Sequence, residues 1–280
     1  MKLAFSTLGC PAWNWQTTIA KAKEYGYDGI EWRVLDGEII SPSLSLGKAA
    51  EIAKAVSAAG LETCALDSGV SLAVGPGEER DKRINEGKAM IKLARSFAAP
   101  MLRVFPGTYP ESVSDDQALQ WMADSLRLLI PDAKAAGVRV ALEVHDSLGW
   151  DRRARRGNSA SALTARLAAT VASPQVGVLW DLGNPYLEGE TPAEAWGNVK
   201  DQCIFVHAKD MRANAAGQWE YVLPGQGAMP LLDVAAWLKE ARYDGWISIE
   251  WEKKWHPEIP DPEVAFPAYH AAMQAWLRCC

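Results

Sequence analysis

The feature that most constrains the fold is a regular alternation of short apolar segments with amphipathic ones. Eight apolar runs are each followed by a stretch whose apolar residues recur at helical spacing. Because parallel strands must be joined by crossovers, and helices are the common crossover, this order indicates a parallel sheet covered by helices. The strand-like runs are 2–7, 29–32, 61–66, 101–105, 138–144, 176–181, 203–208 and 246–251. The helical stretches are 16–25, 47–59, 79–98, 115–136, 160–172, 191–200, 230–241 and 263–278.

The joints between these units also repeat. The segments EYGYDGIEW, SAAGLETC, KAAGVRVALE and ARYDGWISIE each place a glycine before a strand, where glycine accepts the left-handed conformation that ends a helix. Eight β-then-α units in 280 residues favour a (β/α)8 TIM barrel, an α/β fold forming a single domain over residues 1–280. A doubly wound open sheet is the alternative, but no G-x-G-x-x-G follows the first strand.

Composition excludes several classes of protein. A formal net charge of −6 argues against binding to a nucleic-acid backbone. No apolar run approaches the roughly 20 residues of a membrane helix, and no signal peptide is expected at the N-terminus. Five scattered cysteines without C-x-x-C spacing fit a reducing cytoplasm better than a disulfide scaffold. We therefore expect a cytoplasmic protein, for which a homo-oligomer is compatible with the sequence.

The chemistry of such a barrel lies at the carboxyl ends of its strands. There the last four strands carry Glu143, Asp181, His207 and Glu250, about one βα unit apart. Three converging carboxylates repel one another, and a buried carboxylate without a partner is too costly to persist. A divalent cation resolves both problems, and oxygen ligands with one nitrogen suit Mn²⁺, Mg²⁺, Co²⁺ or Zn²⁺. The alternative is that these are ordinary polar residues facing solvent at strand ends. That explanation suits a single residue better than four residues in consecutive units.

These segments resemble the xylose-isomerase-like TIM-barrel family, also described as sugar phosphate isomerase/epimerase. The resemblance covers essentially the whole chain, and its most specific parts are ALEVHD, VGVLWDLGNP, FVHAKDMR and GWISIEWE. It implies that Glu143, Asp181, His207 and Glu250 bind one divalent metal ion, with Mn²⁺ expected. It also implies that Glu143 and Glu250 are the catalytic residues that move protons on opposite faces of a sugar.

Residues around this set are candidates for binding the substrate. By the resemblance, Asn184 stands where many relatives have a substrate-binding histidine, and Arg212 stands where they have a basic residue. Lys209 is a weaker basic candidate. The substrate-binding prediction also includes His145, Trp15 and Arg103, all near expected strand ends. The run DRRARRGN, with Arg152, Arg153, Arg155 and Arg156, could bind an anionic group, although a solvated loop is favoured.

The expected chemistry follows from the metal set. A cation bound to the vicinal oxygens of an α-hydroxy ketone acidifies the adjacent C–H, and a carboxylate then removes the proton to give an enediolate. Reprotonation gives an epimer or an isomer, whereas loss of a β-hydroxyl gives a dehydrated product. We therefore predict an isomerase or epimerase of a small keto sugar or cyclitol. A metal-dependent lyase or dehydratase is the alternative, and an inactive binding subunit is less favoured.

The same family includes the more remote endonuclease IV, whose zinc cluster needs many histidines. This chain has four histidines and a net charge of −6. Nucleic acid is therefore not an expected partner.

Overall fold

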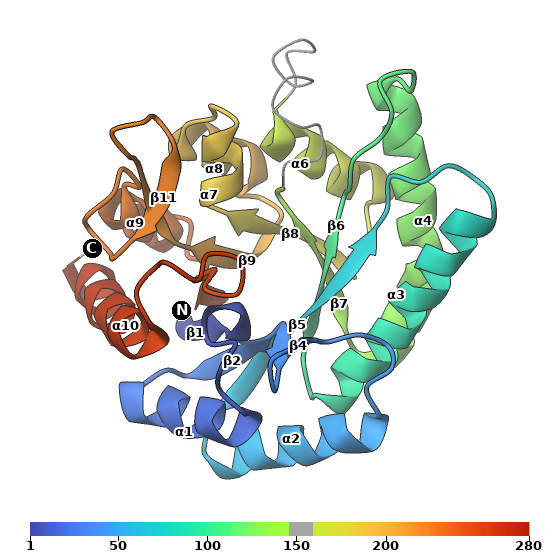
Figure 1. The fold of residues 1–280 in the computed structure, drawn as a ribbon. Coiled ribbons are helices and arrows are strands. Elements are labelled where there is room, and N and C mark those ends of the chain that lie inside the picture. Colours follow the sequence, from blue (N-terminus) through green and yellow to red (C-terminus); the bar gives the residue numbers. More distant parts are fainter. Residues whose placement is uncertain (146–158, 280) are drawn as a thin grey trace.

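Eight parallel strands close into a barrel in the computed structural model, which describes residues 1–145 and 159–279 (Figure 1). The strand order around the barrel is β1-β12-β9-β8-β7-β6-β5-β2. The barrel closes at β1, where Phe5 is in register with Ile30 on one side and with Ile249 on the other. The strands are β1 (Lys2–Ser6), β2 (Gly29–Trp32), β5 (Glu62–Ser71), β6 (Met101–Phe105), β7 (Arg139–Glu143), β8 (Val176–Asp181), β9 (Cys203–Ala208) and β12 (Trp246–Ile249). The predicted (β/α)8 barrel is confirmed, and the open sheet is excluded.

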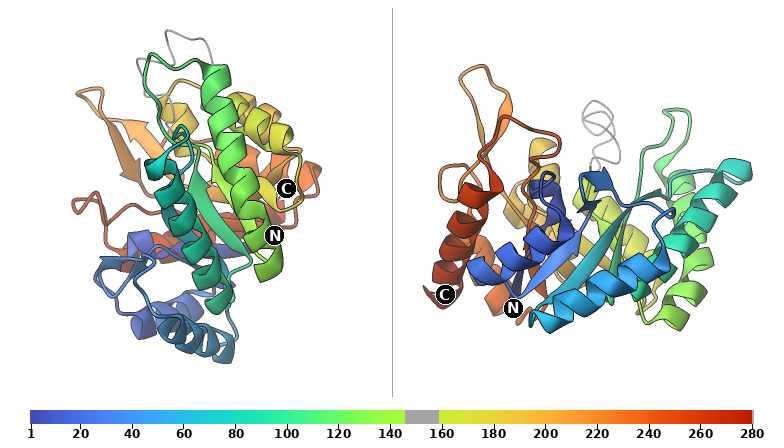
Figure 2. Two further views of the ribbon diagram at one scale, coloured as in Figure 1. Left: turned by 90° about the vertical axis from the view of Figure 1, so that its right-hand side faces the viewer. Right: turned by 60° about the horizontal axis from the view of Figure 1, so that its bottom comes forward.

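A ring of helices covers the outside of the barrel (Figures 1 and 2). Several begin with a side-chain cap, as at Asn14, Ser45 and Ser114, whose oxygens accept backbone N–H groups of the first turn. The helices of the ring are α1 (Trp15–Tyr25), α2 (Leu46–Ala58), α3 (Glu78–Ser96), α4 (Asp115–Ala136), α6 (Ala160–Val171), α8 (Pro192–Val199), α9 (Leu231–Glu240) and α10 (Pro262–Cys279). None of the helices among the described residues is long and apolar enough to cross a membrane.

The glycine joints behave as predicted at three places and differently at the fourth. Gly26, Gly60 and Gly137 adopt positive φ beside the ends of their helices. Before β12, however, the left-handed residue is Arg242, with φ 55°, and not Gly245. Gly245 is required for another reason, because a Cβ there would collide with the ring and hydroxyl of Tyr243.

Several short elements that the sequence did not reveal stand at the carboxyl ends of the strands. A single 3-10 turn, η1 (Thr7–Gly9), follows β1, and α7 (Gly183–Leu187) follows β8. Two antiparallel ribbons complete this end: β3 (Val34–Leu35) with β4 (Glu38–Ile39), and β10 (Asp210–Ala213) with β11 (Trp219–Val222). Figure 2 shows the second ribbon rising from one end of the barrel. These elements surround the end at which the predicted site residues lie.

Asp210 holds the chain that follows the β10–β11 ribbon. Its buried carboxylate accepts backbone N–H groups from Met211 at 2.9 Å, Gly225 at 2.8 Å, Gly227 at 3.0 Å and Met229 at 3.1 Å. Hydrogen bonds to a carboxylate are among the strongest in proteins. The Asp210 side chain therefore holds four backbone N–H groups at this point of the chain. Removing it leaves N–H donors without partners.

We expect Asp210→Ala to lower the free energy of unfolding by roughly 3 kcal/mol, because buried donors lose their acceptor. Urea denaturation followed by circular dichroism measures the change. Asp201→Ala, at an exposed aspartate, is the matched control. Equal stability of the two variants would show that the loop does not depend on this carboxylate.

Candidate functional site

The period-two geometry of the strands places the site residues on the inner face of the barrel. Ala141, Leu179 and Phe205 belong to a buried apolar cluster. Because side chains on one face of a strand recur every second residue, the next inward positions are Glu143, Asp181 and His207. Neighbouring strands bring them level, since Asp181 is in register with His207. The carboxylates and the imidazole therefore lie next to a layer of apolar side chains inside the barrel.

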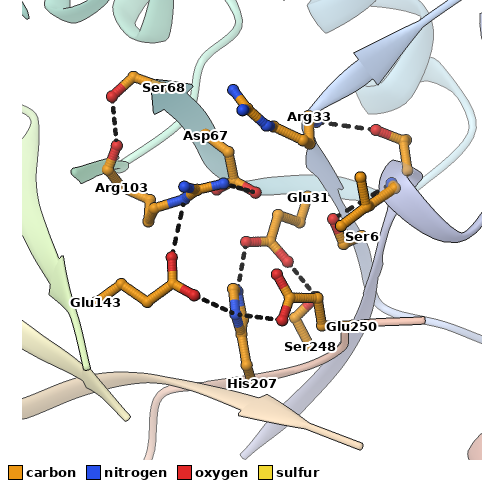
Figure 3. Close-up of polar contacts among 12 residues, drawn as sticks. Ser6, Glu31, Arg33, Asp67, Ser68, Arg103, Glu143, His207, Ser248 and Glu250 are labelled. Carbon is orange, nitrogen blue, oxygen red and sulfur yellow. Dashed lines mark hydrogen bonds and ion pairs between the residues drawn. The ribbon is translucent and has the colours of Figure 1, made fainter. Parts of the chain in front are cut away.

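The four predicted metal ligands converge. One potential ligand atom from each of them lies within 4.8 Å of all the others, and all four residues are buried. His207 Nδ1 is 3.3 Å from Glu250 Oε2, 3.6 Å from Asp181 Oδ2 and 3.9 Å from Glu143 Oε1. Figure 3 shows Glu143 and Glu250 on either side of the imidazole. The structure thus brings together residues that come from four different strand ends.

His207 is oriented by a carboxylate on its far side. Its Nε2 lies 2.7 Å from Glu31 Oε1, and Ser248 Oγ donates to Glu31 Oε2 at 2.6 Å. With Nε2–H donated to Glu31, the lone pair of Nδ1 points at the three carboxylates, which is the arrangement of metal-binding histidines. Sequence reasoning assigned no role to Glu31. The available signal was its position at the end of β2, equivalent to that of the four ligands.

The donor set fits a divalent cation. His207 Nδ1 is buried and has no hydrogen-bond partner in the described part of the chain, while Asp181 Oδ2 and Glu143 Oε2 lie within ion-pair distance of the cations Lys209 and Arg103. Burial opposes a charge on His207, yet Glu250 and Glu31 raise the pKa of the imidazole well above its usual value. The cluster therefore attracts positive charge, and a metal ion at Nδ1 would replace the proton there.

Lys209 adds a positively charged side chain to the same cluster. Its Nζ is 2.9 Å from Asp181 Oδ2, 2.5 Å from Glu250 Oε2 and 3.0 Å from Glu252 Oε1. Burial alone would lower the pKa of the ammonium, but the charges of Asp181 and Glu250 raise it well above its usual value. Lys209 thus lies inside the site, and its contact with substrate stays a prediction.

Two other predicted substrate residues adjoin Glu143. Arg103 is 3% exposed, with Nε 3.2 Å from Glu143 Oε2 and Nη2 3.5 Å from Asp67 Oδ2. Asn184 Nδ2 donates to Glu143 Oε1 at 3.4 Å, while its backbone N–H donates to Asp181 Oδ1 at 2.6 Å. Both residues position candidate metal ligands, a role that the sequence did not suggest.

Arg212 and Trp15 make their contacts away from the four candidate ligands, whereas the charge of His145 acts on Glu143. Arg212 is exposed on the β10–β11 ribbon and pairs with Glu220 at 2.6 Å. Trp15 begins α1 and has Lys48 Nζ 4.7 Å from the centre of its ring, and His145 packs edge-on against Phe105. Their substrate-binding roles stay predictions. Arg152, Arg153, Arg155 and Arg156 lie outside the described residues.

We expect Glu31→Gln to weaken metal binding by about 10- to 100-fold, because the imidazole loses the carboxylate that sets its tautomer. Isothermal titration of the metal-free protein with Mn²⁺ and with Zn²⁺ measures the affinity. Glu24→Gln, at an exposed glutamate, should bind as the wild type does. Unchanged affinity in Glu31→Gln would contradict this role.

Part of the chain is similar in sequence to a known enzyme. An inosose dehydratase of Lacticaseibacillus casei is 26% identical over 185 residues, which cover 59% of this chain. The match spans 57% of that enzyme, so the chain corresponds to little more than half the length of this relative.

Solved structures share the fold over their full length. The structure described as the IolI protein with a bound zinc atom superposes with a TM-score of 0.78 at 20% identity, covering 100% of this chain and 99% of that one. The 3-keto-D-glucoside 4-epimerase YcjR of E. coli gives a TM-score of 0.74 at 20% identity and covers both chains completely (100%). The model of the family described as "Xylose isomerase-like TIM barrel" matches residues 19–278. The chain therefore belongs to the xylose isomerase-like TIM-barrel family.

Proposed function

We propose that the protein is a divalent-metal-dependent isomerase or epimerase of a small keto sugar or cyclitol. The observation that carries the proposal is His207 Nδ1, which is buried, has no hydrogen-bond partner among the described residues, and faces three carboxylates. The metal would be held by Glu143, Asp181, His207 and Glu250. Mn²⁺ is the proposed ion, and Zn²⁺, Mg²⁺ or Co²⁺ suits the same donors.

A cation held there supplies positive charge against the negative charge that develops when an α-hydroxy ketone loses a proton. Proton transfer itself falls to Glu143 and Glu250, which lie on either side of His207 in Figure 3. Two carboxyl groups on opposite sides of a bound sugar can remove a proton from one face and return it to the other. That sequence inverts one carbon centre.

The surroundings of the two glutamates differ in a way that suits this exchange. Burial raises the pKa of Glu143, although the charge of Arg103 opposes the shift. Burial also disfavours the charge on Glu250, but His207 and Lys209 together hold its pKa well below the usual value. The two glutamates therefore differ in their electrostatic surroundings, with the cations His207 and Lys209 at Glu250 and Arg103 at Glu143.

A dehydratase is the second candidate, because Lys209 places an additional proton donor in the site. Its ammonium is 2.5 Å from Glu250 Oε2, so it adjoins the group that would remove the first proton. A third acid of this kind can protonate a departing hydroxyl. The 26% identical relative is an inosose dehydratase, which is consistent with this alternative. An inactive binding subunit is least favoured, because all four candidate ligands are present and converge.

The proposed partner is a small sugar or cyclitol, and the proposed location is the cytoplasm. The cysteines that the structure describes are free thiols, which suits a reducing compartment.

Metal content by mass spectrometry, with wild type beside Glu250→Gln, tests the proposal first. We expect about one equivalent of metal in the wild type. The variant, which loses one charged ligand, should bind the metal at least about tenfold more weakly. Exposed Glu240→Gln is the control. Absence of bound metal in wild type, even after incubation with Mn²⁺, would refute the proposed mechanism.

Incubation of the metal-loaded protein with keto sugars in deuterated water separates the two reactions. An isomerase or epimerase should exchange an α C–H for deuterium and keep the substrate's composition, as NMR would show. A dehydratase should also release water, and Lys209→Met should then lose elimination by about 10²-fold or more while retaining exchange. Full elimination in Lys209→Met would exclude Lys209 as the acid.

A further inference from the structure

Arg33 is a cation near the site that is attracted by the charges of Asp67, Glu143 and Glu250 but forms no ion pair with a described carboxylate. It follows β2, and its backbone N–H donates to Thr7 Oγ1 at 2.9 Å. Its guanidinium Nη1 is buried without a hydrogen-bond partner, and no carboxylate among residues 1–145 and 159–279 forms an ion pair with it. By contrast, Arg103 and Lys209 are each ion-paired. A buried guanidinium N–H that binds nothing is costly, so this group is suited to a ligand.

Arg103 offers a second unused donor. Its Nε and Nη2 lie within ion-pair distance of Glu143 and Asp67. Its Nη1 has no ion pair and, like Nε, is buried without a hydrogen-bond partner in the described part of the chain. The residue is 3% exposed, and its guanidinium stacks 4.1 Å from the centre of the Phe105 ring. The guanidinium is therefore held in place with one edge free.

The two guanidinium groups are neighbours. Figure 3 draws Arg33 beside Arg103 and Asp67, above the cluster that contains His207. Burial and then the positive charge of Arg103 lower the pKa of Arg33 to about 10, although the charges of Asp67, Glu143 and Glu250 oppose the shift, and Arg33 stays charged at neutral pH. Two like charges held together in a partly buried place are stabilised when an anion lies between them.

We propose that Arg33 and Arg103 form a subsite for an anionic group of the substrate, a carboxylate or a phosphate. The enzyme would then act on acidic keto sugars or cyclitols in preference to neutral ones. This inference rests on the proposed function, because it assigns a substrate class to the same site. Arg103 links the two regions: its Nε contacts Glu143, so a group bound at its Nη1 lies within one small molecule's length of the candidate metal ligands.

Three keto sugars with the same carbon skeleton that differ only at C6 test the subsite: D-fructose, D-fructuronate and D-fructose 6-phosphate. Ligand-observed NMR titration of the full-length, metal-free protein measures binding without turnover. We expect the wild type to bind at least one of the acidic sugars roughly tenfold or more tightly than D-fructose. A preference for fructuronate identifies a carboxylate site, and a preference for the 6-phosphate identifies a phosphate site.

Arg33→Gln should abolish this preference, whereas Arg33→Lys should retain part of it. Arg278→Gln, at an exposed arginine of α10, is the control. Thermal unfolding verifies that each variant is folded. Equal binding of the three sugars by the wild type, or a persistent preference in folded Arg33→Gln, would overturn the proposal.

Failure of the anion subsite can be distinguished from failure of the proposed function. Loss of metal binding with an intact, Arg33-dependent preference for acidic sugars would leave the subsite standing and remove the isomerase proposal. Metal-dependent exchange on D-fructose, with no preference for acidic sugars, would support the isomerase proposal and remove the subsite.

Discussion

The convergence of carboxylates at one end of the barrel is the constraint on which the site depends. Glu143, Asp181 and Glu250 reach within a few ångströms of one imidazole, and all are buried. Such a group is stable only with compensating positive charge. Arg103 and Lys209 provide part of it through ion pairs with Glu143, Asp181 and Glu250. A divalent cation at His207 would provide the rest.

The barrel makes this arrangement rigid. Below the charges lies a layer of apolar side chains that includes Ala141, Leu179 and Phe205, and the ring of Phe205 lies 5.2 Å from that of His207. Behind the imidazole, Glu31 and Ser248 form a chain of hydrogen bonds that connects β9 to β2 and β12. Three of the ligands lie on paired strands, and Glu250 directly follows β12 with its backbone N–H bonded to Ala208, so the geometry is set largely by the sheet register.

The cations around the cluster divide it into two sides. Lys209 lies beside Asp181 and Glu250, and Arg103 with Arg33 lies beside Glu143 and Asp67. In the proposed mechanism the Lys209 side would influence proton transfer, because His207 and Lys209 together hold the pKa of Glu250 low against the effect of burial. The arginine side is the proposed anion subsite, because Nη1 of Arg33 and Nη1 of Arg103 are buried without a hydrogen-bond partner among the described residues. A single fold can thus keep its metal set and change its chemistry through the neighbouring cations.

The sequence by itself determined the barrel, the order of its strands and helices, and the four candidate ligands. These follow from local periodicity, because a period of two decides which side chains face inward and parallel strands end at one edge. Only the tertiary structure decided which groups pair. Glu31 and His207 are 176 residues apart, and the ion pairs of Arg103, the placement of Lys209 and the unpaired Nη1 of Arg33 depend on barrel closure. Local patterns carry no record of such contacts, since the distance between two side chains from separate strands is set by packing and register alone.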